Sequence, residues 1–184
     1  MALGTIYRHV DSKAQLFGLA LIHGVGEDIE PWMRQRKWTR DIAGFLESSI
    51  AQWFTGAADF AAQFDSDPDY DLEDALCLLY DATERQRYAI RMLDRSAREW
   101  PELSKIYVQK VRGPAMALLL DILNSLQARG VVRPLHDTEA SARFVLETVA
   151  WFAMHRIFSP GEISISDETA RIVALDHLLA SLRA

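Results

Sequence analysis

The sequence predicts an all-α protein. Apolar residues recur three and four positions apart along most of its 184 residues, a spacing that places them on one face of a helix. Proline and glycine divide the chain into helix-sized segments, and no segment alternates apolar and polar residues as a half-buried strand does. Together these observations favour a helical bundle.

The first elements are two helices that meet near Asp11. Residues 4–10 carry polar and aromatic groups on one side, and a second helix is expected from 13 to about 36, with Pro31 bending or interrupting it. Ser12 and Gln15 have the spacing of a capping box at its start. Lys13 therefore lies beside free N–H groups at the positive end of a helix, which is a natural place to hold a phosphate.

The middle of the chain reads as two helical stretches around a loop. Thr39 can cap a helix with an apolar stripe through residue 53, and residues 56–70 are loop-like. The acidic residues of this loop lack the glycine and distal glutamate of a calcium loop, so we expect it to be solvated. Residues 71–98 are helical again, with a break expected near 81–84 and Thr83 as a cap. Their arginines alternate with acids, which favours an ion-paired exposed face over a nucleic-acid groove.

The last third contains three further helical segments. Pro101 begins the first, Gly113-Pro114 kinks or splits it, and Gly130 ends it near residue 129. The second runs from 137 or 138 to about 157 and is apolar on nearly its whole circumference, so it needs cover on several sides. The third follows a Ser166-Asp167 cap. Two such terminal helices suit a four-helix dimer interface, and we expect a homodimer through the last two helices.

Composition restricts the kind of protein. Hydrophobic residues make up 49% and charged residues 25%, as in a soluble globular protein. The single cysteine, Cys77, excludes an internal disulfide, and its apolar neighbours favour a small buried hydrophobe over a reactive thiol. No apolar run is long enough to span a membrane and no signal peptide is evident, so we expect a cytoplasmic protein without a membrane partner.

Charge is unevenly distributed. The net charge is −6, yet residues 1–40 contain six basic and four acidic side chains, a balance of +2 that leaves −8 for the remainder. A mildly basic end on an acidic body is compatible with a small DNA-facing module attached to a larger domain that does not touch DNA.

No constellation of catalytic residues appears. None of the five histidines has a metal-ligand spacing, and the chain has no phosphate-binding glycine loop or nucleophile elbow. We therefore expect no enzyme activity, no cofactor and no metal. A small helical enzyme remains a third class, which would require turnover that survives mutation of Arg8 and Lys13.

A binding pocket for a small apolar or aromatic effector is the better-supported second feature. Aromatic residues are spread over helices that must share a core, and most will be plain core, but aromatics with a few polar ends also line such sites. The candidate ligand-binding residues are Trp53, Phe64, Tyr80, Tyr88, Trp151 and His155.

The stretch GTIYRHVDSKAQL resembles the end of the helix-turn-helix in TetR-family transcriptional regulators, roughly G-T-(aliphatic)-Y-x-(H/Y)-F-x-S-K-x-x-L. Val10 replaces the usual aromatic residue. Residues 127–137 are similar, more weakly, to a later helix, its glycine turn and the next helix start in that family. The matching positions of the first motif are Gly4, Thr5, Ile6, Tyr7, His9, Ser12, Lys13 and Leu16.

The resemblance implies a DNA-binding regulator, as a repressor, controlled by a small effector. It implies that residues 5–9 form the recognition helix. The side chains at 5, 7, 9 and 13 would contact phosphates, and those at 3, 4 and 8 would face bases, because the arginine fork matches guanine. The alternative is that these groups are solvent-exposed at a frayed chain end. The implied DNA-binding residues are Leu3, Gly4, Thr5, Tyr7, Arg8, His9 and Lys13.

The resemblance also suggests a domain division. Residues 1–37 would be the remnant of a DNA-binding domain with a truncated helix-turn-helix, and 38–184 a ligand-binding and dimerisation domain. In the family about thirty residues precede this motif and form the first two helices. Binding to a double-stranded operator is therefore expected if those two helices are present. Two alternatives remain: a fragment or misassigned start of a longer regulator, and a ligand-binding helical dimer without DNA binding.

Overall fold

The computed structural model describes residues 10, 12–26, 28–34, 70–159 and 165–184. In these ranges the chain forms helices and a single isolated β-bridge, between Val132 and Arg183. The chain divides into two compact units, each with its own core. The first comprises Met1–Phe54 and Tyr88–Val111, and the second Thr55–Arg87 and Arg112–Ala184.

The first unit contains α2 (Lys13–Gly24), α3 (Glu30–Arg34), most of α7 (Arg87–Ala97) and α8 (Pro101–Tyr107). Its buried core residues come from α2, α7 and α8, and the ring of Phe17 meets that of Trp100 edge-on at 5.6 Å. The buried members are Leu21, Ala89, Leu93, Leu103, Ile106 and Tyr107.

Helices α2 and α7 come very close at Gly24. A Cβ atom on Gly24 would lie 3.3 Å from the backbone nitrogen of Ala89 and 3.4 Å from its Cα. These distances are tighter than ordinary packing, and the opposing atoms belong to a backbone that cannot rotate away. A side chain at position 24 would therefore force the two helices apart by a few tenths of an ångström.

The helix expected from 13 to about 36 is shorter than predicted. Ser12 caps it as expected, accepting a hydrogen bond from the backbone N–H of Gln15 at 3.1 Å. The helix ends at Gly24, and Gly26 takes a left-handed backbone with φ 87°. The left-handed conformation terminates the helix, so Pro31 falls within the separate short helix α3 rather than bending a long one.

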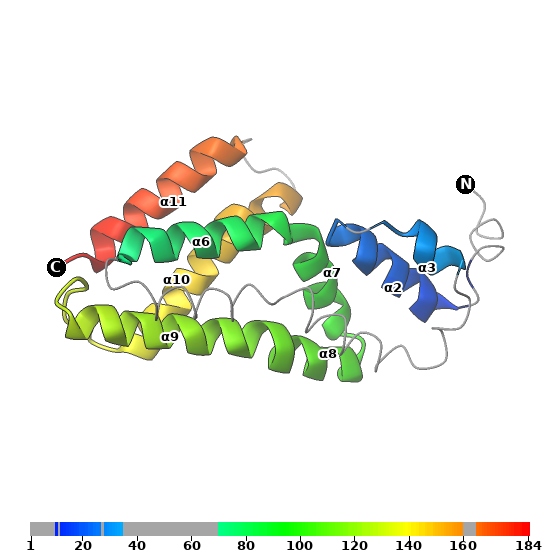
Figure 1. Cartoon of the computed structure of the whole chain (residues 1–184), viewed down its shortest axis with the longest axis horizontal. Helices are drawn as coiled ribbons and strands as arrows, with labels where there is room; N and C mark the ends of the chain where they lie inside the picture. Colours follow the sequence, from blue (N-terminus) through cyan, green and yellow to red (C-terminus); the bar gives the residue numbers. More distant parts are fainter. Residues whose placement is uncertain (1–9, 11, 27, 35–69, 160–164) are drawn as a thin grey trace. The chain divides into compact units, whose positions relative to one another are not determined.

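The second unit is built from α6 (Leu72–Arg85), α9 (Gly113–Ala128), α10 (Thr138–Ala153) and α11 (Asp167–Leu182). Helix α10 contacts α6, α9 and α11, and α6 also contacts α11 (Figure 1). Apolar residues from all four helices form one core, because each presents a buried stripe to α10 or its neighbours.

The boundaries in this part mostly agree with the sequence. Pro101 begins α8, and Gly130, with φ 76°, follows the end of α9. The split near Gly113-Pro114 is confirmed. Five residues of π-helix, η1 (Val108–Arg112), precede α9 there, because Pro114 has no N–H to give to the carbonyl four residues earlier.

Two expected boundaries were wrong. The break between α6 and α7 lies at Gln86, not at residues 81–84, and the hydroxyl of Thr83 donates to the carbonyl of Leu79 at 2.8 Å inside α6 instead of capping. The helix expected to reach residue 157 ends at Ala153, and η2 (His155–Phe158) continues as a 3₁₀ helix. Because the hydroxyl of Thr83 is hydrogen-bonded within α6, Thr83 does not cap the start of the next helix.

Candidate functional site

Most residues of the predicted DNA-binding surface lie outside the described part of the chain. They are Leu3, Gly4, Thr5, Tyr7, Arg8 and His9. Lys13 is described: it is the exposed first residue of α2, next to the Ser12 cap. Its role in DNA binding, and the predicted domain boundary between 37 and 38, stay predictions.

The candidate ligand-binding residues are divided among several environments. Trp53 and Phe64 also lie outside the described residues, and Tyr88 is 55% exposed in the first unit. The other three, Tyr80, Trp151 and His155, belong to the second unit. Trp151 packs edge-on against Phe152, with ring centroids 4.9 Å apart, and is half-buried like His155.

Tyr80 is the most deeply buried of the candidates. It lies on α6 with an exposed fraction of 0% and is part of the second unit's core. Its hydroxyl forms no hydrogen bond of normal geometry with any described residue, although the guanidinium of Arg156 is close. Burial, and to a smaller extent the negative charge of Glu84, raises the pKa of Tyr80 to about 12, because both effects outweigh the lowering by the positive charge of Arg156.

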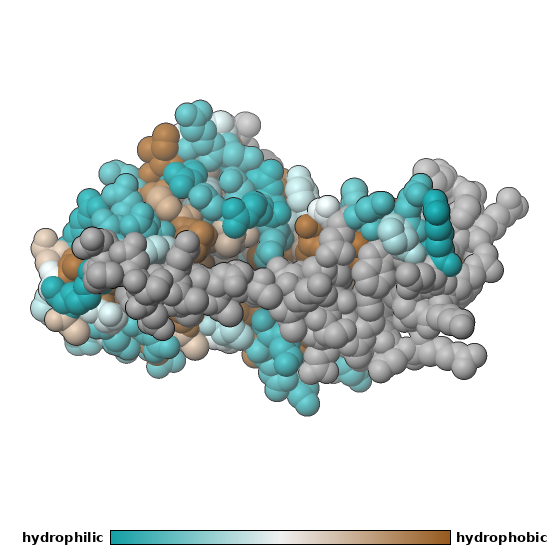
Figure 2. Space-filling view, viewed as in Figure 1, coloured by the Kyte–Doolittle hydropathy of each residue, from teal (hydrophilic) through white to brown (hydrophobic). Residues whose placement is uncertain are grey.

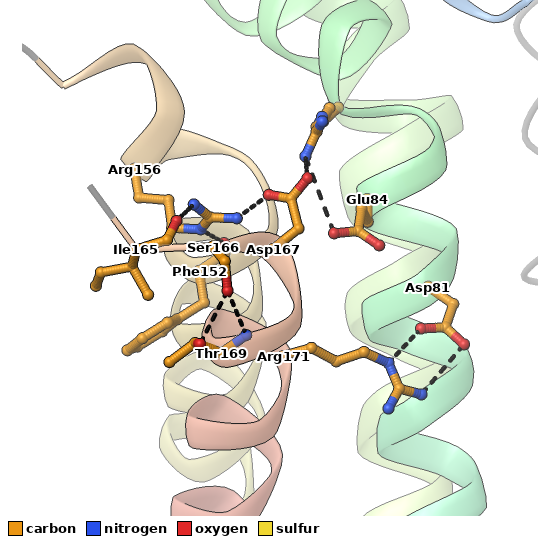
Figure 3. Close-up of polar contacts among 10 residues, drawn as sticks. Asp81, Glu84, Phe152, Arg156, Ile165, Ser166, Asp167, Thr169 and Arg171 are labelled. Carbon is orange, nitrogen blue, oxygen red and sulfur yellow. Dashed lines mark hydrogen bonds and ion pairs between the residues drawn. The ribbon is translucent and has the colours of Figure 1, made fainter.

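Arg156 in η2 is the centre of a buried polar cluster (Figure 3). Its side chain is 7% exposed. Its Nε donates to the carbonyl of Phe152 and its Nη1 to the carbonyl of Ile165, both at 2.6 Å, while Nη2 donates to the carboxylate of Asp167. Arg156 thus joins the end of α10 to the start of α11, since Asp167 is the first residue of α11.

Asp167 also binds a second arginine. Its other carboxylate oxygen accepts a hydrogen bond from Arg87 at 3.0 Å, and Arg87 lies 3.9 Å from Oε1 of Glu84. Burial alone would raise the pKa of the Asp167 carboxyl, but hydrogen bonds from Arg87 and Arg156 and the positive charges of both hold it below its ordinary value. Asp167 therefore stays ionised and holds two cations at once.

Three ion pairs join α11 to the α6 side of this unit. They are Glu73–Arg183 at 2.9 Å, Asp81–Arg171 at 2.8 Å and Arg87–Asp167 at 3.0 Å. The residue numbers rise along one partner as they fall along the other, as expected for antiparallel neighbours. We call these three pairs the ion-pair ladder; Figure 3 shows the second of them.

Sequence reasoning missed this cluster. The arginines after residue 84 were expected to form an exposed, ion-paired face. Arg87 does pair with Glu84, but the two side chains are only 19% and 29% exposed, so the expected exposure was wrong for this pair. The link from Arg87 to Asp167 crosses eighty residues, and no local pattern marks it. The one available signal was Ser166-Asp167, predicted as a helix cap, where the hydroxyl of Ser166 does accept from the N–H of Thr169 at 3.1 Å.

Cys77 also lies in the second unit, on α6. It is half-buried, not fully buried as expected. Desolvation raises the pKa of its thiol despite the nearby guanidinium of Arg171. A thiol with a raised pKa is a poor nucleophile, which agrees with the prediction of a packing role.

A surface pocket of about 290 Å³ lies between the α9–α10 connection, the first turns of α10 and the end of α11. Several of its polar groups are already bonded to neighbouring backbone: Arg133 to the carbonyl of Ser181 and Ser141 to that of Asp137. The pocket therefore offers mainly apolar walls. Its apolar residues are Leu135, Ala140, Phe144 and Leu182.

The described residues contain no group of three or more His, Cys, Asp or Glu side chains that could hold a metal ion. Among them, no helix combines the length and apolar character that crossing a membrane requires.

Comparison with known proteins assigns the class of fold. No family model matches the chain, and no curated protein matches it. Among solved structures, it is similar to a bacterial regulatory protein in the tetR family from Rhodococcus RHA1, with 17% identity and a TM-score of 0.53. The likeness covers 94% of this chain and 98% of that one. The fold is thus the all-α fold of a TetR-family regulator, as the sequence predicted.

Proposed function

We propose that the protein is a TetR-like DNA-binding transcriptional regulator, a repressor controlled by a small apolar or aromatic effector, and not an enzyme. The observation that carries this proposal is the likeness of fold over 94% of the chain. The motif at residues 4–16 supports it independently, because it resembles the recognition helix of the same family.

A homodimer through α10 and α11 is part of the proposal, since a dimer reads two half-sites at a fixed spacing. Large apolar side chains on these helices are exposed in the single chain: Phe144 at 59%, Ile172 at 58% and Val173 at 36%. Figure 2 shows hydrophobic side chains on the face of α11 that is turned to the viewer. Exposed apolar surface of this kind is typical of an interface.

Dimerisation is testable with a matched pair of variants. We expect Phe144→Arg to halve the mass measured by analytical ultracentrifugation. Val108→Arg, which changes a residue 50% exposed in the first unit, should leave the mass unchanged. The proposed interface would be contradicted if Phe144→Arg and Val108→Arg had equal masses, or if the wild type were a monomer.

DNA binding is testable by selection from fragmented genomic DNA, followed by affinity measurements between about 50 and 200 mM salt. Binding that neutralises phosphates weakens steeply with salt. We expect Lys13→Ala to lower the salt dependence by about one phosphate contact, whereas Lys105→Ala, an exposed lysine on α8, should not. A dimer that selects no DNA would favour the ligand-binding dimer without DNA binding.

A further inference from the structure

We propose that the surface pocket at the start of α10 is the seat of Trp151 from a second copy of this chain. In a two-fold dimer each copy then fills the pocket of the other. The inference rests on the homodimer of the proposed function and names the contact that holds it together. Trp151 and the pocket both belong to the second unit.

Helix α10 has two opposite faces. The residues of its inner face, which are all 0% exposed, are Ala142, Val145, Val149 and Ala153. Two residues turn an α-helix by about 200°, so positions 140, 144, 147 and 151 lie on the opposite side, again three and four residues apart. We call Ala140, Phe144, Glu147 and Trp151 the outer stripe. Phe144 is 59% exposed and Trp151 is half-buried, so both rings are accessible to a second copy.

The pocket and Trp151 lie symmetrically about Phe144. The pocket reaches from Phe144 back to Asp137, seven residues toward the start of α10, and Trp151 is seven residues toward its end. At 1.5 Å per residue, each lies about 10 Å from Phe144 along the helix. Two-fold symmetry makes residue i contact residue j and residue j contact residue i. Antiparallel α10 helices that meet near Phe144 at about 20°, as in a four-helix bundle, therefore bring each Trp151 to the other copy's pocket.

The charges beside the outer stripe favour this antiparallel arrangement. The side chains of Arg143 and Glu147 are 54% and 48% exposed. With the two-fold axis near Phe144 and Val145, Arg143 lies opposite the second copy's Glu147, and Glu147 opposite the second copy's Arg143. Parallel helices would place each of these residues opposite its own copy. Like charges would then face each other, which is unfavourable.

The pocket suits an aromatic side chain with one donor. Its volume of about 290 Å³ is at the lower limit of sites for drug-sized ligands, about 300 Å³. At its edge, the carboxylate of Asp137 accepts a hydrogen bond from the N–H of Ala140 at 2.9 Å, and a carboxylate can accept several more. The indole N–H of Trp151 needs such an acceptor when it is buried. The apolar walls that would receive the ring are Leu135, Ala140, Phe144 and Leu182.

The test is a double-substitution cycle in the full chain, with the dissociation constant of the dimer measured by sedimentation equilibrium. Trp151→Ala removes the side chain that enters the pocket, and Ala140→Arg blocks the pocket. Within one chain these positions are about 16 Å apart along α10, too far for their substitutions to interact directly. A non-additive effect therefore reports contact between two copies.

We expect Trp151→Ala to raise the dissociation constant at least about 30-fold, as the loss of a central tryptophan does. Ala140→Arg should raise it at least about tenfold in the wild-type background. In the Trp151→Ala background, Ala140→Arg should raise it less than about threefold, because no side chain enters the pocket there. Circular dichroism melting curves establish that each variant is folded.

Ala128→Arg is the matched control. Ala128 is the exposed last residue of α9 and lies outside the pocket, so this substitution should leave the dissociation constant unchanged. The comparison of Ala140→Arg with Ala128→Arg also decides the case if Trp151→Ala does not fold. Equal dissociation constants for these two arginine variants would overturn the proposal and leave the pocket to another ligand. Effects of Trp151→Ala and Ala140→Arg that simply multiply would overturn it as well.

Sedimentation needs neither DNA nor an effector, so the pairing and the regulator fail separately. Non-additive effects at positions 140 and 151, in a dimer that selects no DNA, would sustain the pairing and contradict the regulator. A dimer that selects DNA but shows independent effects at the two positions would sustain the regulator and contradict the pairing. A wild-type monomer would overturn the pairing whatever DNA selection shows.

Discussion

The carboxylate of Asp167 accepts a hydrogen bond from the guanidinium of Arg156, whose side chain is 7% exposed. All three nitrogens of that guanidinium donate: two to backbone carbonyls and one to Asp167. A buried cation is tolerated when its donors are satisfied and a counter-charge is adjacent. The pair therefore links η2, which follows α10, to the first residue of α11.

We expect Arg156→Ala to lower the free energy of unfolding by about 2–4 kcal/mol, because two part-buried carbonyls lose their donor and a cavity is left. Urea unfolding followed by circular dichroism measures this. Arg143→Ala is the control: its side chain is 54% exposed and pairs with Glu147 one turn away, so it should cost under about 0.5 kcal/mol. Similar losses for the two variants would contradict a structural role for Arg156.

The Asp167 carboxyl predicts a loss of stability in acid. Its pKa in the folded protein is below the ordinary value, so the unfolded chain takes up the proton first as the pH falls. The contribution is present above about pH 4, the ordinary value for aspartate, and is lost as the pH falls through the folded-state pKa.

Urea midpoints at pH 7, 5, 4 and 3 test this prediction. The wild type should exceed Asp167→Asn at pH 7, and the gap should narrow below about pH 4. Asp176→Asn, an exposed aspartate on the same helix, should show no such gap. A gap that stays constant to pH 3 would show that the charge of Asp167 contributes nothing.

Removal of the Tyr80 hydroxyl should not destabilise the protein at neutral pH. The group is buried without a hydrogen-bond partner among the described residues, so Tyr80→Phe removes a desolvated polar atom and keeps the ring. We expect the unfolding free energy to be equal to or above that of the wild type. A loss above about 1 kcal/mol would reveal a hydrogen bond there.

The same substitution should matter in alkali. The unfolded chain loses the tyrosine proton near the ordinary pKa of about 10, whereas folded Tyr80 keeps it to about pH 12. The wild type therefore loses stability relative to Tyr80→Phe as the pH rises from about 10 toward 12. Absorbance at the tyrosinate band should show an ionisation step near pH 12 that is missing in the variant.

Gly24→Val should destabilise the first unit by about 1–3 kcal/mol, the usual cost of forcing extra carbons into a packed contact. The new Cβ would lie 3.3 Å from the backbone of Ala89. His23→Val, at the exposed neighbouring position on α2, is the control and should change stability by less than about 1 kcal/mol. Thermal unfolding of both variants measures whether the close contact between residue 24 and the backbone of Ala89 restricts the size of the side chain at position 24.

The sequence by itself determined the helical class and most boundaries in the last two-thirds of the described chain. Pro101, Pro114 and Gly130 act locally, through a missing N–H or a left-handed backbone, so their effects are readable without tertiary contacts. The caps at Ser12 and Ser166 were predictable for the same reason. The family resemblance at residues 4–16 likewise came from the sequence and agrees with the fold likeness.

Tertiary structure alone decided which polar residues meet. Arg87 and Asp167 are eighty residues apart, and Asp81 and Arg171 ninety; each pair exists because α6 and α11 pack as antiparallel neighbours. Local propensity carries no information about such pairing. From the sequence alone, a charged residue on a helix is predicted to be solvated, because the helix that carries its partner is not known. The break at Gln86 and the burial of Tyr80 have the same origin, since packing between helices overrides weak local preferences.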